Sequence, residues 1–220
     1  MDILDAIQAR HSVRAFLSKP VPRDIVMKIM AAATRSPSGG NGQPWEIFIA
    51  SGATIETIRL AYQERARAAS AGPGGPATLP PPPQPAFIQE RMTTIRTERM
   101  RLLGLDPADP ASGKVFMEMG ARLYGAPVLA VICMDKALSS YLDIGLLIQT
   151  LCLAAQGFGV DSIIAQSLVA QPDILRREQE IPDSLNIVTG IGLGYPDPEN
   201  IINTYLTPRR PMDEVVRYKS

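Results

Sequence analysis

The sequence predicts one domain of mixed helices and strands, and two observations support this fold class. Segments in which apolar residues recur at helical spacing alternate along the chain with short apolar runs bounded by Gly, Pro or Asp. A chain of 220 residues is also long enough to bury one sizeable core, with room for an insertion. The helices and strands can be placed in chain order from these patterns.

Two helices are predicted before the first strand. Residues 2–10 carry apolar side chains on one helical face and acidic residues in the first turn, where the helix dipole favours carboxylates. Pro22 suits the first position of a second helix, whose apolar residues recur at helical spacing and end before Pro37. A run of strand formers, Trp45 to Ala50, predicts the first strand, and a third helix follows over 54–67.

The second half of the chain contains the remaining core strands and the most apolar helix. Three short apolar runs predict strands over 128–134, 160–165 and 186–193. Between the first two of these, residues 142–158 predict a helix that is apolar almost all round. Its continuously apolar part is shorter than the roughly 20 residues that a bilayer requires, so we expect it inside the protein and not in a membrane.

A different kind of sequence separates the first strand from the later three. Residues 72–85 are crowded with proline and glycine and cannot sustain a helix or a sheet, because proline lacks the amide donor and glycine lacks restraint. Further helices are predicted over 87–103 and 114–124. We therefore predict one domain over residues 1–220 with an insertion at about 68–115. This insertion is either a solvated linker with a surface helical hairpin or a lid over a ligand site.

Charge and cysteine usage exclude several classes of protein. Lys plus Arg and Asp plus Glu both number 22, so the formal net charge is zero, and we expect no nucleic-acid partner and no binding to an anionic membrane. Cys133 and Cys152 lie in apolar stretches and are expected to be buried, reduced thiols, which suits the cytoplasm. The acidic start of the chain does not have the pattern of a signal peptide.

Two short segments carry the strongest indication of function. The run Arg10–Phe16 (RHSVRAF) places two guanidinium groups and a hydroxyl within five residues, which suits a phosphate or another compact anion. The turn Ser36–Trp45 (SPSGGNGQPW) offers backbone N–H groups that no side chain covers. Together the two segments predict two sides of a cleft for a large phosphorylated ligand.

The sequence lacks the motifs of several classes of active site. His11 is the only histidine, which excludes a histidine-based triad elsewhere in the chain and a metal site built from several histidines; no metal is expected. The closely spaced glycines at 190–194 lead into Pro196 and not into a helix, so they make a poor dinucleotide-binding fingerprint. A phosphate site without an evident nucleophile, general base or metal cage indicates that a bound cofactor performs the reaction.

Five segments resemble, in order and spacing, the family of FMN-dependent nitroreductases. They are residues 10–16, residues 37–45, residues 157–165, residues 190–196 and the closing run 208–216 (PRRPMDEVV). The resemblance extends over nearly the whole chain except about 68–115. It implies an α+β sandwich, with a central, mostly antiparallel sheet covered by helices, and an intertwined homodimer that binds FMN at its interface. The apolar helix 142–158 would then be the buried dimer helix; a helix in the core of a monomer is the alternative.

The resemblance also implies which residues bind the flavin. Arg10 and Ser12 would lie toward the phosphate and ribityl chain and Arg14 toward the pyrimidine edge, while His11 would supply a hydrogen bond and packing without acid–base work. Residues expected from the same subunit are therefore Arg10, His11, Ser12 and Arg14, and those expected from the other subunit are Pro37, Ser38, Gly39 and Asn41.

Further flavin contacts are implied by later segments. The strand that contains Ile163, Ile164 and Ala165 would pass its backbone by the flavin ring, where a main-chain N–H can address N5, and its side chains would be ordinary core. Arg209, with Arg210, would return from the C-terminus to the phosphate. Arg122 stands where some relatives carry a lysine near the flavin.

The implied activity is the reduction of FMN by NADPH or NADH, followed by reduction of a nitroaromatic or related quinone-like acceptor with ping-pong kinetics. Flavin N5 would carry the chemistry, and Arg14 would stabilise negative charge on the reduced flavin. Methionine and aromatic residues of the insertion could line an apolar cavity for a small aromatic acceptor. A reductive dehalogenase or another FMN reductase of the same fold, and a protein that stores or senses FMN without turnover, are the alternatives.

Overall fold

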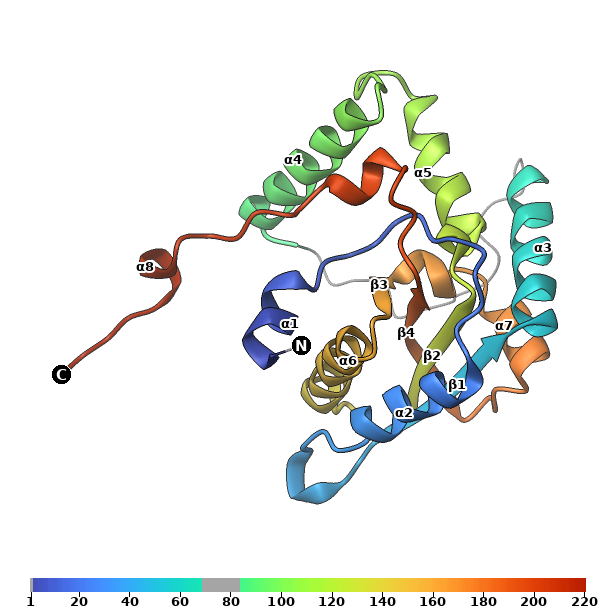
Figure 1. Cartoon of the computed structure of the whole chain (residues 1–220), viewed down its shortest axis with the longest axis vertical. Coiled ribbons are helices and arrows are strands. Elements are labelled where there is room, and N and C mark those ends of the chain that lie inside the picture. The colour runs from blue at the N-terminus through green and yellow to red at the C-terminus, as the bar shows by residue number, and fades with distance from the viewer. Residues whose placement is uncertain (1, 69–83) are drawn as a thin grey trace.

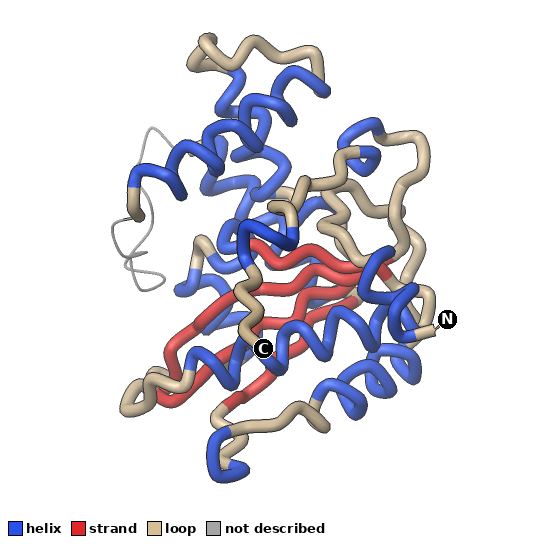
Figure 2. The backbone as a smooth tube through the Cα atoms, turned by 90° about the vertical axis from the view of Figure 1, so that its left-hand side faces the viewer, coloured by secondary structure: helices blue, strands red, loops and turns tan. Residues whose placement is uncertain are grey.

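The computed structural model describes residues 2–68 and 84–220, and an antiparallel sheet forms its centre (Figure 1). Every pair of neighbouring strands in this sheet is antiparallel. Helices cover both faces of the sheet, as Figure 2 shows, so the predicted α+β class is confirmed. The four strands, in the spatial order β1-β2-β4-β3, are β1 (Trp45–Ser51), β2 (Val128–Asp135), β3 (Asp161–Ala165) and β4 (Leu185–Gly194).

Strand β2 separates two hydrophobic cores. Its residues are buried from Val128 to Met134, and alternate side chains enter opposite cores, as Leu129 and Ala130 do. This burial on both faces explains why β2 is a continuous apolar run in the sequence. One core is closed by α3 (Ala53–Arg67) and α7 (Pro172–Gln179), and the other by α2 (Arg23–Ala33) and α6 (Tyr141–Gly157).

The remaining elements lie around this sandwich. A C-terminal arm leaves the body of the molecule and carries the last short helix away from the sheet (Figure 1). The other α-helices are α1 (Ile3–Ala9), α4 (Ala86–Leu102), α5 (Ser112–Ala121) and α8 (Met212–Val215), and the 3₁₀ helices are η1 (Gly39–Asn41), η2 (Leu123–Gly125), η3 (Gln166–Val169) and η4 (Ile201–Thr204).

The predicted strands and long helices are confirmed, with three corrections. Helix α5 ends at Ala121 and not at residue 124, because Leu123 and Tyr124 adopt left-handed φ values of 52° and 56°. Strand β3 begins at Asp161, one residue after the predicted start. Helix α7 was not predicted, because it spans only 8 residues and is mostly polar. Most of the proline-rich stretch 72–85 lies outside the described residues.

Helix α6 buries only one of its faces, although its sequence is apolar almost all round. Ile144, Leu147 and Leu151 pack in the core, whereas Leu142 is 78% exposed on the other side. No described helix is long and apolar enough to cross a membrane. Cys133 and Cys152 are buried free thiols, as predicted, and burial raises the pKa of both.

The glycines of β4 are packing positions. A Cβ at residue 190 would lie 2.6 Å from Cβ of Leu168, and one at residue 194 would lie 2.6 Å from Cδ of Pro127 and 2.9 Å from Cδ1 of Phe16. Only glycine lets η3 and the segment around Phe16 approach the sheet this closely. The repeated glycines therefore serve packing, which agrees with their weakness as a dinucleotide-binding motif.

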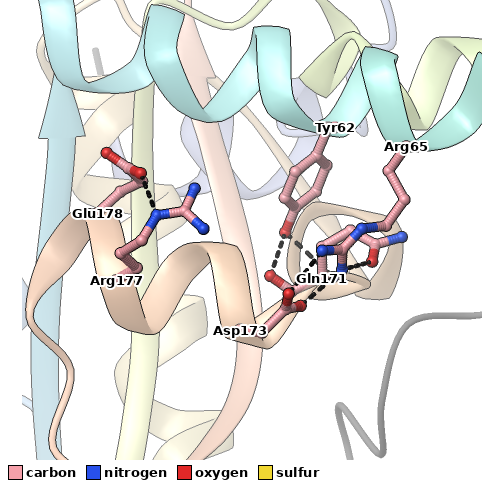
Figure 3. Close-up of polar contacts among 6 residues, drawn as sticks. All are labelled: Tyr62, Arg65, Gln171, Asp173, Arg177 and Glu178. Carbon is pink, nitrogen blue, oxygen red and sulfur yellow. Dashed lines mark hydrogen bonds and ion pairs between the residues drawn. The ribbon is translucent and has the colours of Figure 1, made fainter.

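A buried tyrosine joins α3 to the turn before α7 (Figure 3). The Tyr62 hydroxyl donates to the Leu168 carbonyl oxygen at 3.1 Å and accepts from the backbone N–H of Gln171 at 3.3 Å. Beside it, Arg65 forms two hydrogen bonds of 2.7 and 2.6 Å with the carboxylate of Asp173. Burial raises the pKa of Tyr62, so its hydroxyl stays protonated and keeps both bonds at neutral pH.

The substitution Tyr62→Phe should lower the free energy of unfolding by about 1–2 kcal/mol, because it leaves the buried Leu168 carbonyl and the half-buried Gln171 N–H without their partner. Urea unfolding followed by circular dichroism measures the change. Tyr218→Phe is the matched control, since Tyr218 is 88% exposed. Equal stability of the Tyr62 and Tyr218 variants would show that the hydroxyl does not hold α7.

Candidate functional site

The cationic segment near the N-terminus lies along the outer edge of β3. Ser12 forms a parallel bridge with Ser162, and the Val13 N–H donates to the Ser162 carbonyl oxygen at 3.1 Å. Val13 and Phe16 are buried, whereas Arg10, Ser12 and Arg14 remain accessible. The extended backbone therefore turns apolar side chains inward and keeps the cationic and hydroxyl groups accessible.

Arg10 has the features of an anion-binding residue. It follows the last residue of α1 in an extended conformation, and its half-buried side chain has a buried Nε without a hydrogen-bond partner among the described residues. A buried donor without a partner is costly, and a bound anion would satisfy it. His11 donates from Nδ1 to the Ala9 carbonyl oxygen at 3.0 Å, a local bond that fits the expected structural role.

Arg14 is held with its charge partly desolvated. Its guanidinium donates to the Ser12 carbonyl oxygen at 2.9 Å. Burial, and then the nearby charge of Arg99, lower the pKa of Arg14 to about 10. The group is therefore still cationic at neutral pH. Neither Arg14 nor Arg10 forms an ion pair with a carboxylate in residues 2–68 or 84–220, so their positive charge is available to a ligand.

Asn203 fixes the backbone at Arg14, and sequence reasoning missed it. Its Oδ1 accepts from the N–H groups of Arg14 and Ala15 at 2.8 and 3.2 Å, and its Nδ2 donates to the carbonyl oxygens of Ala15 and Asp197 at 2.8 and 3.0 Å. The two segments are 189 residues apart in the chain. No local pattern signals a contact at this separation.

The predicted strand residues meet the cationic segment, with one correction. Ile163 is 3% exposed and packs in the core, but Ile164 is 39% exposed. The expectation that all these side chains are ordinary core is wrong for Ile164, because side chains alternate along β3. Ala165 is half-buried. The structure therefore brings Ile163, Ile164 and Ala165 beside Arg10–Arg14, with an apolar side chain exposed there.

The glycine-rich turn lies away from this segment within one protomer (Figure 1). Gly39 donates its N–H to Asp143 Oδ1 at 3.1 Å, which ties the turn to the start of α6. The next two residues, Gly40 and Asn41, have φ values of 55° and 59°, a conformation that favours glycine and tolerates asparagine. Pro37, Ser38, Gly39 and Asn41 thus form a tight exposed turn that does not meet Arg10 in the same chain.

The C-terminal arginines make no hydrogen bond to Arg10 among the described residues. Arg209 donates to the Thr207 carbonyl oxygen at 2.7 Å, and Arg210 pairs with Glu214 at 3.1 Å. Both side chains are exposed on the arm that leaves the body (Figure 1). Their contacts within the described chain are local.

Arg122 lines a cavity of about 440 Å³, and Arg14 lines the same cavity. The cavity lies among α3, α5 and the Arg14–Phe16 segment. Sequence reasoning did not assign Arg59, which also lines it and donates to the Ala126 carbonyl oxygen at 2.6 Å. A separate contact joins α4 to the chain after η4, where the Tyr205 hydroxyl donates to Glu98 Oε2 at 2.6 Å.

Comparison with known proteins places the chain in a family. The model of the nitroreductase family matches residues 7–195, so the chain belongs to this family. It is similar to the nitrobenzene nitroreductase of Ectopseudomonas oleovorans, with 34% identity over 207 residues that cover 89% of this chain and 88% of that protein.

Solved structures give the same relationship. The FMN and NADPH-dependent nitroreductase NfnB from Sphigopyxis sp. strain HMH superposes with a TM-score of 0.91 and 25% identity over 100% of both chains. NfnB from Mycobacterium smegmatis, described as FMN-dependent and solved in complex with NADPH, superposes with a TM-score of 0.89, again at 25% identity over 100% of both chains.

The substitution Asn203→Ala should release the segment at Arg14. We expect faster hydrogen exchange at the amides of Arg14 and Ala15 and a free energy of unfolding lower by about 2 kcal/mol, since two backbone donors lose their acceptor. Asn203→Asp keeps the Oδ1 acceptor and should preserve protection of both amides better than Asn203→Ala. Unchanged exchange in the alanine variant would contradict the role of Asn203.

Proposed function

We propose that the protein is an FMN-dependent nitroreductase that oxidises NAD(P)H and reduces nitroaromatic compounds. The observation that carries this proposal concerns Arg10 and Arg14, two arginines without a carboxylate partner among the described residues. They lie beside the edge strand β3, which exposes Ile164, in a chain of the nitroreductase family. The relatives that share 30% identity or more over most of this chain are named for nitroreduction, whereas a homologue of iodotyrosine dehalogenase shares only 22%. The neighbouring structures are named for FMN and NADPH. These names do not favour the dehalogenase or the storage alternative.

The residues present fit the phosphate and ring of FMN. The buried, unpartnered Nε of Arg10 suits a phosphate oxygen, and Ser12 adds a hydroxyl on the same side of the extended segment. Ile164 offers an exposed apolar surface to a ring system. We assign Arg10, His11, Ser12, Arg14 and residues 163–165 to one flavin site on this basis.

When bound, FMN supplies the redox chemistry, by accepting a hydride from NAD(P)H and delivering two electrons to the acceptor. The chain contributes a fixed charge, because Arg14 stays protonated at neutral pH and is held by the Ser12 carbonyl oxygen and, through its backbone, by Asn203. Arg14 would therefore favour negative charge on a bound flavin without reorganising.

We further propose an intertwined homodimer in which each flavin site draws residues from both subunits. Apolar side chains are exposed on α1, on the outer face of α6 and on the C-terminal arm, including Ile3, Leu142 and Met212. Such a surface indicates an interface. A partner would bring its glycine-rich turn, Pro37–Asn41, and could bring Arg209 and Arg210, which make no hydrogen bond to Arg10 in the described part of the same chain. Sedimentation should show a dimer; a monomer that retains FMN would refute this arrangement.

Two wider features complete the proposal. We treat residues 1–220 as one nitroreductase domain with an insertion at about 68–115. We propose that α4, a described helix of this insertion, forms a wall of the acceptor site, supported by the Tyr205–Glu98 bond that joins α4 to the body. We also propose a cytoplasmic location, supported by two buried free thiols.

The activity is tested directly on the purified protein. A yellow protein that NADPH or NADH bleaches anaerobically, and that a nitroarene then reoxidises, supports the proposal. Bleaching without reoxidation by nitroarenes would instead indicate another FMN reductase of this fold. Failure of both nucleotides to bleach bound FMN would favour storage or sensing.

Arg10→Gln should weaken FMN binding about tenfold or more, because one charge-assisted contact to a phosphate is lost. Equilibrium titration of the apoprotein with FMN, followed by flavin fluorescence, measures the dissociation constant. Arg23→Gln is the control, since Arg23 is an exposed residue at the start of α2. Equal FMN affinity of the two variants would remove Arg10 from the site.

Arg14→Gln should lower the midpoint potential of the bound flavin by about 30 mV, since loss of a fixed cation destabilises the reduced state; for two electrons this is about 1.4 kcal/mol. Spectroelectrochemical titration of the loaded protein measures it. If the variant keeps the potential of the unmodified protein, Arg14 does not stabilise the reduced ring.

A further inference from the structure

Helix α4 is weakly attached to the body of the protein. The hairpin of α4 and α5 projects from one end of the sandwich (Figure 1). Of the 17 residues in α4, only Met100 is buried. Among the described residues, one hydrogen bond joins an α4 side chain to an element outside residues 84–121, from the Tyr205 hydroxyl to Glu98 Oε2 at 2.6 Å. A helix held by so few contacts opens at a small cost in free energy.

The bond between Tyr205 and Glu98 lies close to Arg14. Tyr205 follows by two residues Asn203, whose Oδ1 accepts from the backbone N–H of Arg14 at 2.8 Å. Burial and the bond to Glu98 raise the pKa of Tyr205, whereas the charges of Arg99 and Arg14 both act to lower it. The two guanidinium groups, one on α4 and one on the N-terminal segment, therefore lie within Coulombic range of the same tyrosine.

Arg99 is a cation without a counter-ion in the described part of the chain. Its half-buried side chain forms no ion pair there. Its Nε donates to the Ile95 carbonyl oxygen at 3.2 Å, and its guanidinium lies 5.6 Å from the centre of the Phe116 ring on α5. These contacts hold the charge without neutralising it. Because Arg14 also lacks a carboxylate partner there, the two like charges repel each other.

A flavin bound beside Arg14 changes this balance when it is reduced. Hydride transfer adds two electrons and one proton to the ring, so the reduced ring carries one more negative charge than the oxidised ring. A negative charge beside Arg14 attracts Arg99, whereas a neutral ring leaves the repulsion between the two arginines. The free energy of closing α4 therefore differs between the two redox states.

We propose that α4 is a redox-sensitive lid, in which Arg99 draws the helix onto the site when the flavin is reduced and the Glu98–Tyr205 bond positions Arg99. The inference rests on the proposed function, because it needs FMN beside Arg14, and it adds regulation of the same site. The oxidised site stays open to a bulky nicotinamide dinucleotide. The reduced site narrows to a small, flat acceptor.

Hydrogen exchange measures the position of the lid without turnover. The full-length, FMN-loaded protein is compared in the oxidised state and after anaerobic reduction with dithionite, by mass spectrometry of peptides from α4. Reduction should slow exchange in α4 about tenfold. Peptides of α7, on the far side of the sheet from α6, should exchange equally in both states. Equal exchange of α4 in the two states would overturn the inference.

Variants separate the sensing charge from the bond that holds the helix. Arg99→Gln should abolish the difference between the redox states, and Arg99→Lys should keep most of it, since the charge remains. Arg101→Gln, exposed on the same helix, is the matched control and should keep the whole difference. A purely structural role of Arg99 would instead speed exchange equally in both states and leave their ratio unchanged, which would contradict the proposal.

Tyr205→Phe should speed exchange in α4 in both redox states, because the bond to Glu98 is lost in both. Exchange in α4 that is unchanged in this variant would refute the positioning role of the bond. A thermal melt shows that each variant is folded. If Arg99→Gln is not, added salt tests the same point in the unmodified protein, since a Coulombic difference shrinks with ionic strength. A difference that salt leaves intact would overturn the role of Arg99.

The redox potential gives a second readout, because coupling between two equilibria is reciprocal. If reduction favours the closed lid about tenfold, the closed lid favours reduction by the same factor. Arg99→Gln should therefore lower the midpoint potential of the bound flavin by about 30 mV, the two-electron equivalent of tenfold. Arg101→Gln should leave it unchanged. An unchanged potential in Arg99→Gln would overturn the inference.

The proposed function and the lid fail in different ways. If neither NADPH nor NADH reduces the bound FMN, the proposed function is refuted, whereas reduction by dithionite still decides whether α4 responds. If the nucleotides and nitroarenes act as expected but α4 exchanges equally in both states, only the lid is refuted. A protein that binds no FMN would refute both.

Discussion

The bond between the Val13 N–H and the Ser162 carbonyl oxygen is the contact on which the site depends. It joins the N-terminal segment to the outer edge of β3, where Ser12 forms an isolated parallel bridge with Ser162. Because side chains alternate along such a backbone, burying Val13 turns Ser12 and Arg14 to the other side. Asn203 then fixes the same backbone from the C-terminal end of the chain.

The packing of the sheet supports this edge from within. Strand β2 is buried on both faces, and glycines in β4 let η3 and Phe16 lie close to the sheet. A side chain at residue 194 would push Phe16 outward, and with it the segment that carries Arg14. The close packing of Phe16 on β4 therefore contributes both to the stability of the sheet and to the position of the Arg14 charge.

The positive charge that matters to the site comes from a few arginines and not from the net charge of the protein. The chain has no net charge, yet Arg10, Arg14 and Arg122 lack carboxylate partners among the described residues, and Arg14 and Arg122 line one cavity. Burial and the nearby charge of Arg99 lower the pKa of Arg14 to about 10, so Arg14 remains cationic at neutral pH. Such an arrangement suits an anionic ligand beside the Arg14 segment.

The amino-acid sequence alone determined the α+β class, the four strands, most helices and the cationic segment, because apolar periodicity and residue chemistry are local properties. Only the tertiary structure decided the clamp by Asn203, the exposure of Ile164, the end of α5 and the cavity around Arg122. Asn203 and Arg14 are 189 residues apart, and a contact at that separation is set by how the sheet and its covering elements pack. Likewise the turn at Pro37–Asn41 can be recognised from its glycines, but only the fold shows that Gly39 binds Asp143 at the start of α6 and that the turn lies away from α1 (Figure 1).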